Sequence, residues 1–149
     1  MRRWMGWVLV LGIAWNPAVL RAAEPAPSYQ PDKVVYDVAI DTPERFERLL
    51  DRVGYLGSLY GDPFASSIVL VLHGPEVAFF GSKERAKYRK LVERTQGLTM
   101  GEVVQVRMCA VAARAHGLGA ADLPEFVRLV PMGDAEVVKL QREGYAFMK

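Results

Sequence analysis

The chain has 149 residues, 51% of them hydrophobic and 24% charged, and its formal net charge at pH 7 is +2. This length suits one domain that buries its own core. The single cysteine excludes an intramolecular disulfide, so stability has to come from packing.

Residues 1–23 have the pattern of a secretory signal peptide: Arg2 and Arg3, then an apolar run, then small residues. The apolar run is shorter than the roughly 20 residues of a membrane-spanning helix. We therefore expect export to the periplasm with cleavage after Ala22 or Ala23, and an uncleaved anchor is the alternative. Cleavage leaves 16 basic residues against 17 acidic ones, a net charge of −1. Such a chain has no membrane span after processing and no clustered basic face for nucleic acid.

Residues 24–32 are rich in proline and are predicted to form an extended arm, followed by a single domain at residues 33–149. Apolar, β-branched runs predict five strands, at residues 33–40, 67–72, 103–108, 126–130 and 144–148. Helices are predicted from Pro43 to the glycines at 57 and 61, at 83–95 with Ser82 as cap, at 110–116, and at 135–143 with Asp134 as cap, besides one helical turn at 76–80. Strands alternating with helices predict a three-layer α/β/α fold with a mainly parallel sheet of about five strands.

Cys109 follows the third predicted strand and opens the helix at residues 110–116. The carboxyl ends of parallel strands form the edge where ligands usually bind, and the N–H groups of a helix start favour a thiolate or persulfide anion. Cys109 is therefore predicted to be a reactive thiol, and the alternative is a small buried residue, which is common for free cysteine. Arg107, expected on the opposite face of its strand, and Arg114, over one helical turn away, are not assured anion partners.

His73 ends the second predicted strand and should share an edge with Cys109, where it could act as a base or as a hydrogen-bond donor to the sulfur. Alternatively, its imidazole only holds the following turn. His116 lies at a helix C-terminus, where a structural role is expected. Two histidines and one cysteine without ligand spacing predict no metal site, and the absence of a phosphate-binding motif predicts no nucleotide cofactor.

Five segments form a distinctive series along the chain: residues 33–38, residues 69–75, Cys109 with Ala112-Ala113-Arg114 and Gly117 after it, and residues 130–133 and 140–145. Their order and spacing resemble the DsrE/DsrF-like family connected with sulfur relay, in its exported branch. The resemblance covers residues 33–149, with two departures: a longer loop at 96–102, and a glycine-containing stretch at 54–61 in place of an asparagine-rich helix end. It implies a three-layer α/β/α fold, homotrimers, hexamers or related heteromers, and one cysteine that carries sulfur as a persulfide, here Cys109.

The function expected from these observations is sulfur handling: Cys109, assisted by His73, carries or transfers sulfane sulfur as a persulfide. The protein would then be a sulfurtransferase or a sulfur carrier, and its partners would be small sulfur species or a protein donor or acceptor. One alternative is a noncatalytic module that binds a small ligand or a partner and buries Cys109 as a structural residue. Another is a Cys109–His73 hydrolase, which needs the two side chains within hydrogen-bond reach and an oxyanion site.

Overall fold

The computed structural model describes residues 32–60, 66–101 and 103–149, so the predicted signal peptide and most of the arm lie outside the described residues. Its five strands are β1 (Lys33–Val38), β2 (Ser67–Leu72), β3 (Val104–Cys109), β4 (Val127–Val130) and β5 (Ala146–Met148). They form one sheet in the order β4-β3-β2-β1-β5, and all four neighbouring pairs are parallel. The predicted α/β fold with a parallel sheet of about five strands is confirmed.

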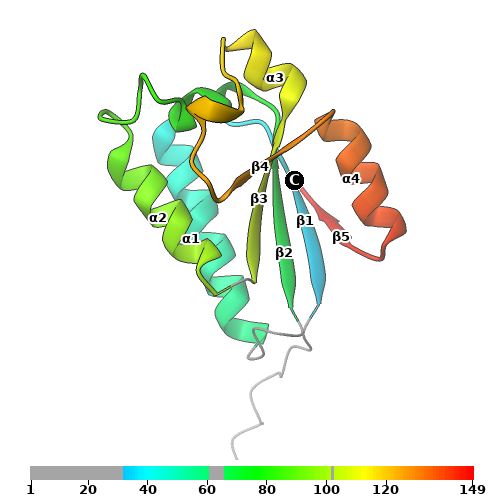
Figure 1. The fold of residues 1–149 in the computed structure, drawn as a ribbon. Coiled ribbons are helices and arrows are strands. Elements are labelled where there is room, and N and C mark those ends of the chain that lie inside the picture. Colours follow the sequence, from blue (N-terminus) through cyan, green and yellow to red (C-terminus); the bar gives the residue numbers. More distant parts are fainter. Residues whose placement is uncertain (1–31, 61–65, 102) are drawn as a thin grey trace, which may run out of the picture.

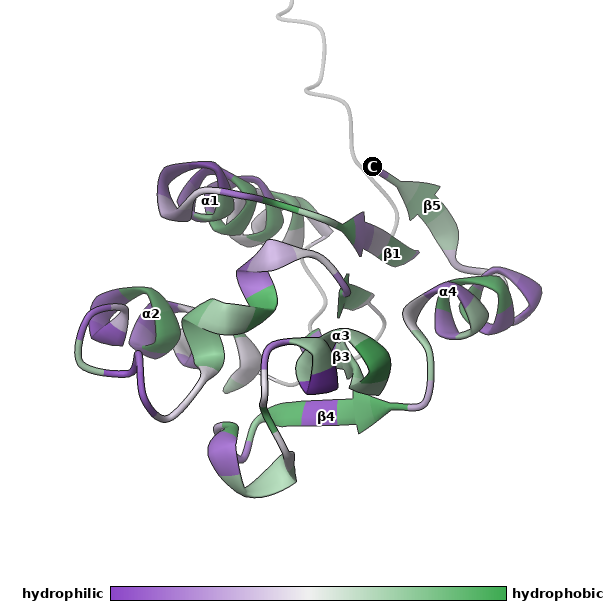
Figure 2. Cartoon of the chain, turned by 90° about the horizontal axis from the view of Figure 1, so that it is seen from above, coloured by the Kyte–Doolittle hydropathy of each residue, from purple (hydrophilic) through white to green (hydrophobic). Residues whose placement is uncertain are grey.

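Helices cover both faces of this sheet. They are α1 (Pro43–Tyr60), α2 (Arg89–Thr99), α3 (Ala110–Ala115) and α4 (Gly133–Arg142), with short 3-10 turns η1 (Pro75–Phe80) and η2 (Ala120–Asp122). α1 and α2 lie on one face and α4 on the other, while α3 stands above the carboxyl ends of the strands (Figures 1 and 2). Within the described residues, no helix is both long enough and apolar enough to cross a membrane.

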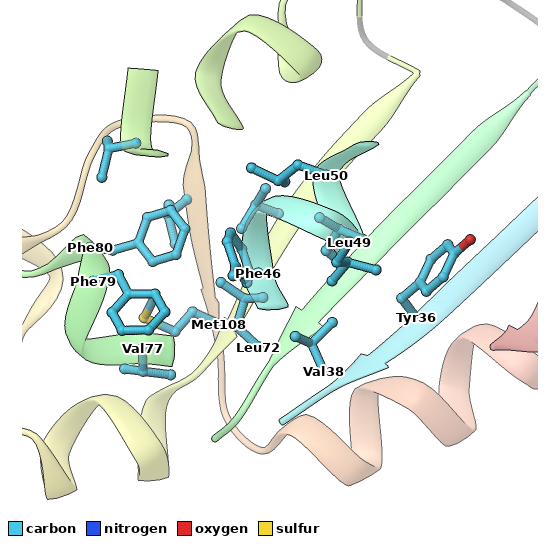
Figure 3. Packing of buried hydrophobic residues seen from close by; sticks show 14 of the residues in the cluster. Tyr36, Val38, Phe46, Leu49, Leu50, Leu72, Val77, Phe79, Phe80 and Met108 are labelled. Carbon is cyan, nitrogen blue, oxygen red and sulfur yellow. The ribbon is translucent and has the colours of Figure 1, made fainter. Parts of the chain in front are cut away.

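The larger core fills the space between the sheet and the layer of α1, α2 and η1. Phe46 of α1 packs edge-on against Phe79 and Phe80 of η1, with ring centroids 6.1 and 5.8 Å apart (Figure 3). Such edge-to-face pairs add to the stabilisation from burial. These aromatic contacts fix η1, and with it the loop that follows β2.

A second, smaller core lies under α4. Val35 of β1 and Val69 and Val71 of β2 pack there against Val137 and Leu140 of α4. The alternate residues of β2 enter the larger core, so this strand is buried on both faces. That explains why its sequence is an unbroken apolar run rather than an alternating one.

Two helices begin at positions other than those predicted. α2 starts at Arg89 instead of residue 83, because residues 83–87 are exposed and have no apolar face to pack, and turns occupy this stretch. Ser82, the expected cap, instead donates its hydroxyl to Asp122 Oδ1 at 2.9 Å. The helix also continues past Gly97 to Thr99, because Leu98 packs against the larger core. α4 starts at Gly133, before the expected cap Asp134.

Candidate functional site

The candidate site lies at the carboxyl edge of the sheet, where β1, β2 and β3 end side by side. His73 directly follows β2, and Cys109 is the last residue of β3. Both therefore reach the edge that the sequence predicted. α4, which follows β4, covers this edge on one side (Figure 1).

Cys109 opens α3 as its N-cap residue and is only 5% exposed. It borders a hollow of about 240 Å³. The hollow is lined by His73, Cys109, Val111, Ala112, Ala115, Met132, Gly133 and Asp134. Two apolar residues of this lining, Val111 and Met132, are about half exposed.

Gly133 brings His73 and Cys109 together. A Cβ built on Gly133 would lie 2.9 Å from the His73 Cβ and 3.4 Å from the Cys109 Cβ. Both neighbours are β-carbons held by strand ends, so neither can swing away. Only a residue without a side chain lets the start of α4 approach the two so closely. The sequence analysis missed this role, although a glycine between two predicted elements was a signal for close backbone approach.

Asp37 of β1 holds the imidazole of His73. Its Oδ1 lies 2.5 Å from His73 Nε2, and both side chains are 25% exposed. The carboxylate fixes the orientation of the ring and leaves Nδ1 as the other nitrogen. The sequence analysis did not select Asp37, because its partner is 36 residues away. Its signal was a lone acid inside an otherwise apolar strand.

Glu76 fixes the backbone on which His73 sits. Its buried carboxylate accepts hydrogen bonds from the N–H of Ile40 at 2.7 Å and of Gly74 at 2.9 Å, joining the segments after β1 and β2. Burial raises the pKa of Glu76 above its ordinary value of 4.5, although the backbone hydrogen bonds and the charge of His73 act in the opposite direction.

Arg107 binds α4 and is not a partner of the Cys109 thiol. The expectation that it lies on the opposite face from Cys109 is wrong, because residues two apart on a strand share a face. Its guanidinium pairs with Glu136 of α4 and donates to Gln105 Oε1 at 2.9 Å. Arg107 and Glu136 are both buried, so the pair ties α4 to β3 beneath the hollow.

The other histidine does not join this site. His116 is the exposed C-cap of α3, and its backbone N–H bonds the carbonyls of Ala112 and Ala113. In the part of the chain that the structure describes, no three His, Cys, Asp or Glu side chains are grouped to hold a metal ion.

The chain is thus a three-layer α/β/α protein with a cysteine at the carboxyl edge of its parallel sheet, the edge where proteins of this class usually bind ligands. The sequence matches the DsrE/DsrF-like family over residues 41–149, and the chain belongs to this family, which is associated with sulfur relay. A protein of unknown function from Methanobacterium thermoautotrophicum has a similar solved structure, with 25% sequence identity and a TM-score of 0.67. The match covers 78% of this chain and 97% of that one. A search of curated proteins found no match.

Proposed function

We propose that the protein takes up sulfane sulfur on Cys109 as a persulfide and passes it on, as a periplasmic sulfur carrier or sulfurtransferase. One observation supports this most directly: Cys109 and His73 line one hollow around Gly133, with Asp37 bound to the imidazole. Membership of a family associated with sulfur relay gives independent support.

The step needs no redox partner. The Cys109 thiolate attacks the outer sulfur of a donor persulfide R–S–SH, and the donor S–S bond breaks as the Sγ–S bond forms. The persulfide proton leaves with the thiol R–SH, and Cys109 is left as a persulfide anion. An acceptor thiolate then attacks the outer sulfur of Cys109, takes it as a new persulfide and restores the Cys109 thiolate.

His73 would move the proton in this scheme. Because Asp37 occupies Nε2, Nδ1 is the nitrogen that takes the proton from the Cys109 thiol, and the protonated imidazole then balances the charge of the persulfide anion. Asp37 touches no sulfur and acts as a positioning residue. The small apolar hollow suits a small persulfide or polysulfide, or a single cysteine side chain of a protein donor.

Intact-mass analysis after polysulfide treatment tests the proposal. The wild-type protein should gain about 32 Da per sulfur atom, and Cys109→Ser should gain nothing. His73→Gln and Asp37→Asn should slow the gain by about 100-fold and 10-fold, because proton transfer by a positioned side chain contributes about 10²-fold or more. Asp41→Asn, which removes an exposed carboxylate from the Arg45 ion pair, is the matched control and should react at the wild-type rate.

The low exposure of Cys109 favours the alternative of a noncatalytic binding module with a structural cysteine. Alkylation separates the two functions. A carrier should react with iodoacetamide in the native state at neutral pH. A Cys109 that reacts only after unfolding, together with no gain of sulfur mass, would establish the structural role.

Periplasmic location is part of the proposal and depends on residues 1–23, which contain all three tryptophans of the chain. Processing after Ala22 or Ala23 should therefore yield a periplasmic protein without tryptophan fluorescence. Mass analysis of the fractionated protein provides the measurement. A full-length, tryptophan-containing protein in the membrane fraction would establish the uncleaved anchor instead.

A further inference from the structure

We propose that a second cavity, beside β1, binds a small organic anion with an apolar body. Along the sheet edge the order is Cys109 on β3, His73 after β2, Asp37 on β1, and then this cavity. Asp37 is part of its wall, so the Asp37–His73 pair lies between the two hollows. The proposal does not rest on persulfide chemistry.

The cavity exists because β5 is shorter than β1. β5 pairs with Val34, Val35 and Tyr36 only, so the last part of β1 has no described strand on that side (Figure 1). The resulting space measures about 420 Å³, far more than the roughly 30 Å³ of a water molecule and within the range of small-molecule sites.

The floor of the cavity is apolar. Tyr36 and Val38 of β1 contribute to it, with Ile40 after the strand and Leu49 from α1. Figure 3 shows Tyr36, Val38 and Leu49 on the side of the sheet that faces α1. A hydrocarbon or aromatic body of a ligand would contact these groups, whereas an inorganic ion would leave most of the space unfilled.

The walls of the cavity are cationic. Arg45, Arg48 and Arg52 lie on successive turns of α1, and Lys149 approaches from the end of β5. Among the described residues only Arg45 of these four has an acidic partner, Asp41 at 2.8 Å. The lining residues carry one side-chain carboxylate, Asp37, and His73 already binds it.

An apolar floor next to cationic walls indicates which class of ligand the cavity would bind. The guanidinium groups of Arg48 and Arg52 are one helical turn apart and match the planar, multi-oxygen geometry of a carboxylate, sulfonate or phosphate. Arg52 also lies 5.8 Å from the ring centroid of Tyr36, which holds its head beside the apolar floor. The ligand would place its charged group between these arginines and its body over Tyr36 and Val38.

Two-dimensional amide NMR of the isotope-labelled exported protein, titrated with benzenesulfonate, tests the site. Saturable shifts are expected at the amides of residues 37–40 and 45–52. The affinity for benzyl alcohol, which is neutral, should be lower by a factor of about ten or more. Arg48→Gln and the Arg48→Gln/Arg52→Gln double variant should each lose about tenfold or more in affinity. Arg142→Gln, which changes an exposed side chain at the end of α4, is the matched control and should bind as the wild type does.

Cys109→Ser should bind benzenesulfonate unchanged, which separates this site from sulfur transfer. The spectrum of each variant reports its folding, and the wild-type shift map stands even where a variant fails to fold. Equal binding of the neutral analogue, shifts located away from β1 and α1, or unchanged affinity in a folded double variant would each overturn the proposal.

Discussion

Gly133 lets the start of α4 approach both His73 and Cys109, the two side chains of the candidate site. Its backbone lies against the β-carbons of His73 and Cys109, and α4 begins at this residue. His73 follows β2 and Cys109 ends β3, so the pairing of these strands holds the two residues side by side. Gly133 determines how closely α4 can approach both, and a single methyl group at this position would push against them.

Gly133→Ala should destabilise the protein by about 1–3 kcal/mol, because the new methyl group overpacks two fixed β-carbons. It should also change the alkylation rate of Cys109. Urea unfolding followed by circular dichroism gives the stability. Gly97→Ala is the control: nothing lies within 4 Å of its Cβ, and alanine in a helix should add about 0.5–1 kcal/mol. Wild-type stability and thiol reactivity in Gly133→Ala would contradict the close approach.

The buried carboxyl group of Glu76, which holds the backbone next to His73, makes the stability of the protein depend on pH. Glu76→Gln replaces one acceptor by a donor, so the N–H of Ile40 or of Gly74 loses its partner, at a cost of about 1–3 kcal/mol. Because the folded-state pKa is raised, the stability that ionisation of Glu76 controls is complete below 4.5 and is lost as the pH rises through the raised pKa.

The stability advantage of the wild type over Glu76→Gln should therefore shrink as the pH rises from about 4.5 through the raised pKa of Glu76. Denaturant unfolding of both proteins across this range provides the measurement. If the advantage grew with pH, the two backbone hydrogen bonds would outweigh burial, and the raised pKa would be wrong.

At the scale of elements, α4 is held over the sheet by a small apolar core and by one buried ion pair. The core contributes Val137 and Leu140, and the ion pair joins Glu136 to Arg107 of β3. One nitrogen of Arg107, Nε, is buried without a hydrogen-bond partner among the described residues. A buried pair of this kind costs much desolvation, so it fixes the position of α4 more than it adds stability.

Glu136→Ala should therefore destabilise the protein by about 3–5 kcal/mol, because it leaves the Arg107 charge buried alone. Arg107→Met combined with Glu136→Leu should recover most of this loss. Thermal and denaturant unfolding of the single and double variants measure the coupling. Lys139→Met, at the exposed end of the same network, should change stability by about 0.5 kcal/mol or less. Additive effects in the double variant would rule out the pairing as the cause.

The sequence pattern predicted correctly those helices and strands that are determined by neighbouring residues in the chain. The run at residues 67–72 has the observed bounds of β2 because both of its faces are buried. The start of α2 was misplaced because Ser82 has a distant partner, Asp122, which a capping rule cannot see. The candidate site divides in the same way: His73 and Cys109 follow from strand ends, whereas Asp37 and Gly133 act through contacts that only the fold creates.

For the molecule as a whole, association is the main prediction still to be tested. Val111 and Met132, beside the hollow, are 52% and 49% exposed and would gain from being covered. We expect a homo-oligomer, a trimer or a hexamer, as the family resemblance implies. Light scattering after size-exclusion chromatography measures the mass, with Val138→Lys on the outer side of α4 as the control for Met132→Lys. A monomer at all concentrations would contradict this expectation.

The place of β5 next to β1 has a consequence for how the chain matures. These two strands come from opposite ends of the described domain, so their pairing closes a loop that contains every other element. Contacts of such long sequence separation form late and slowly. Until β5 docks, the outer edge of β1 offers free backbone groups to any extended chain nearby. The interval before the last strand docks is therefore the period in which the folding chain is most exposed to aggregation.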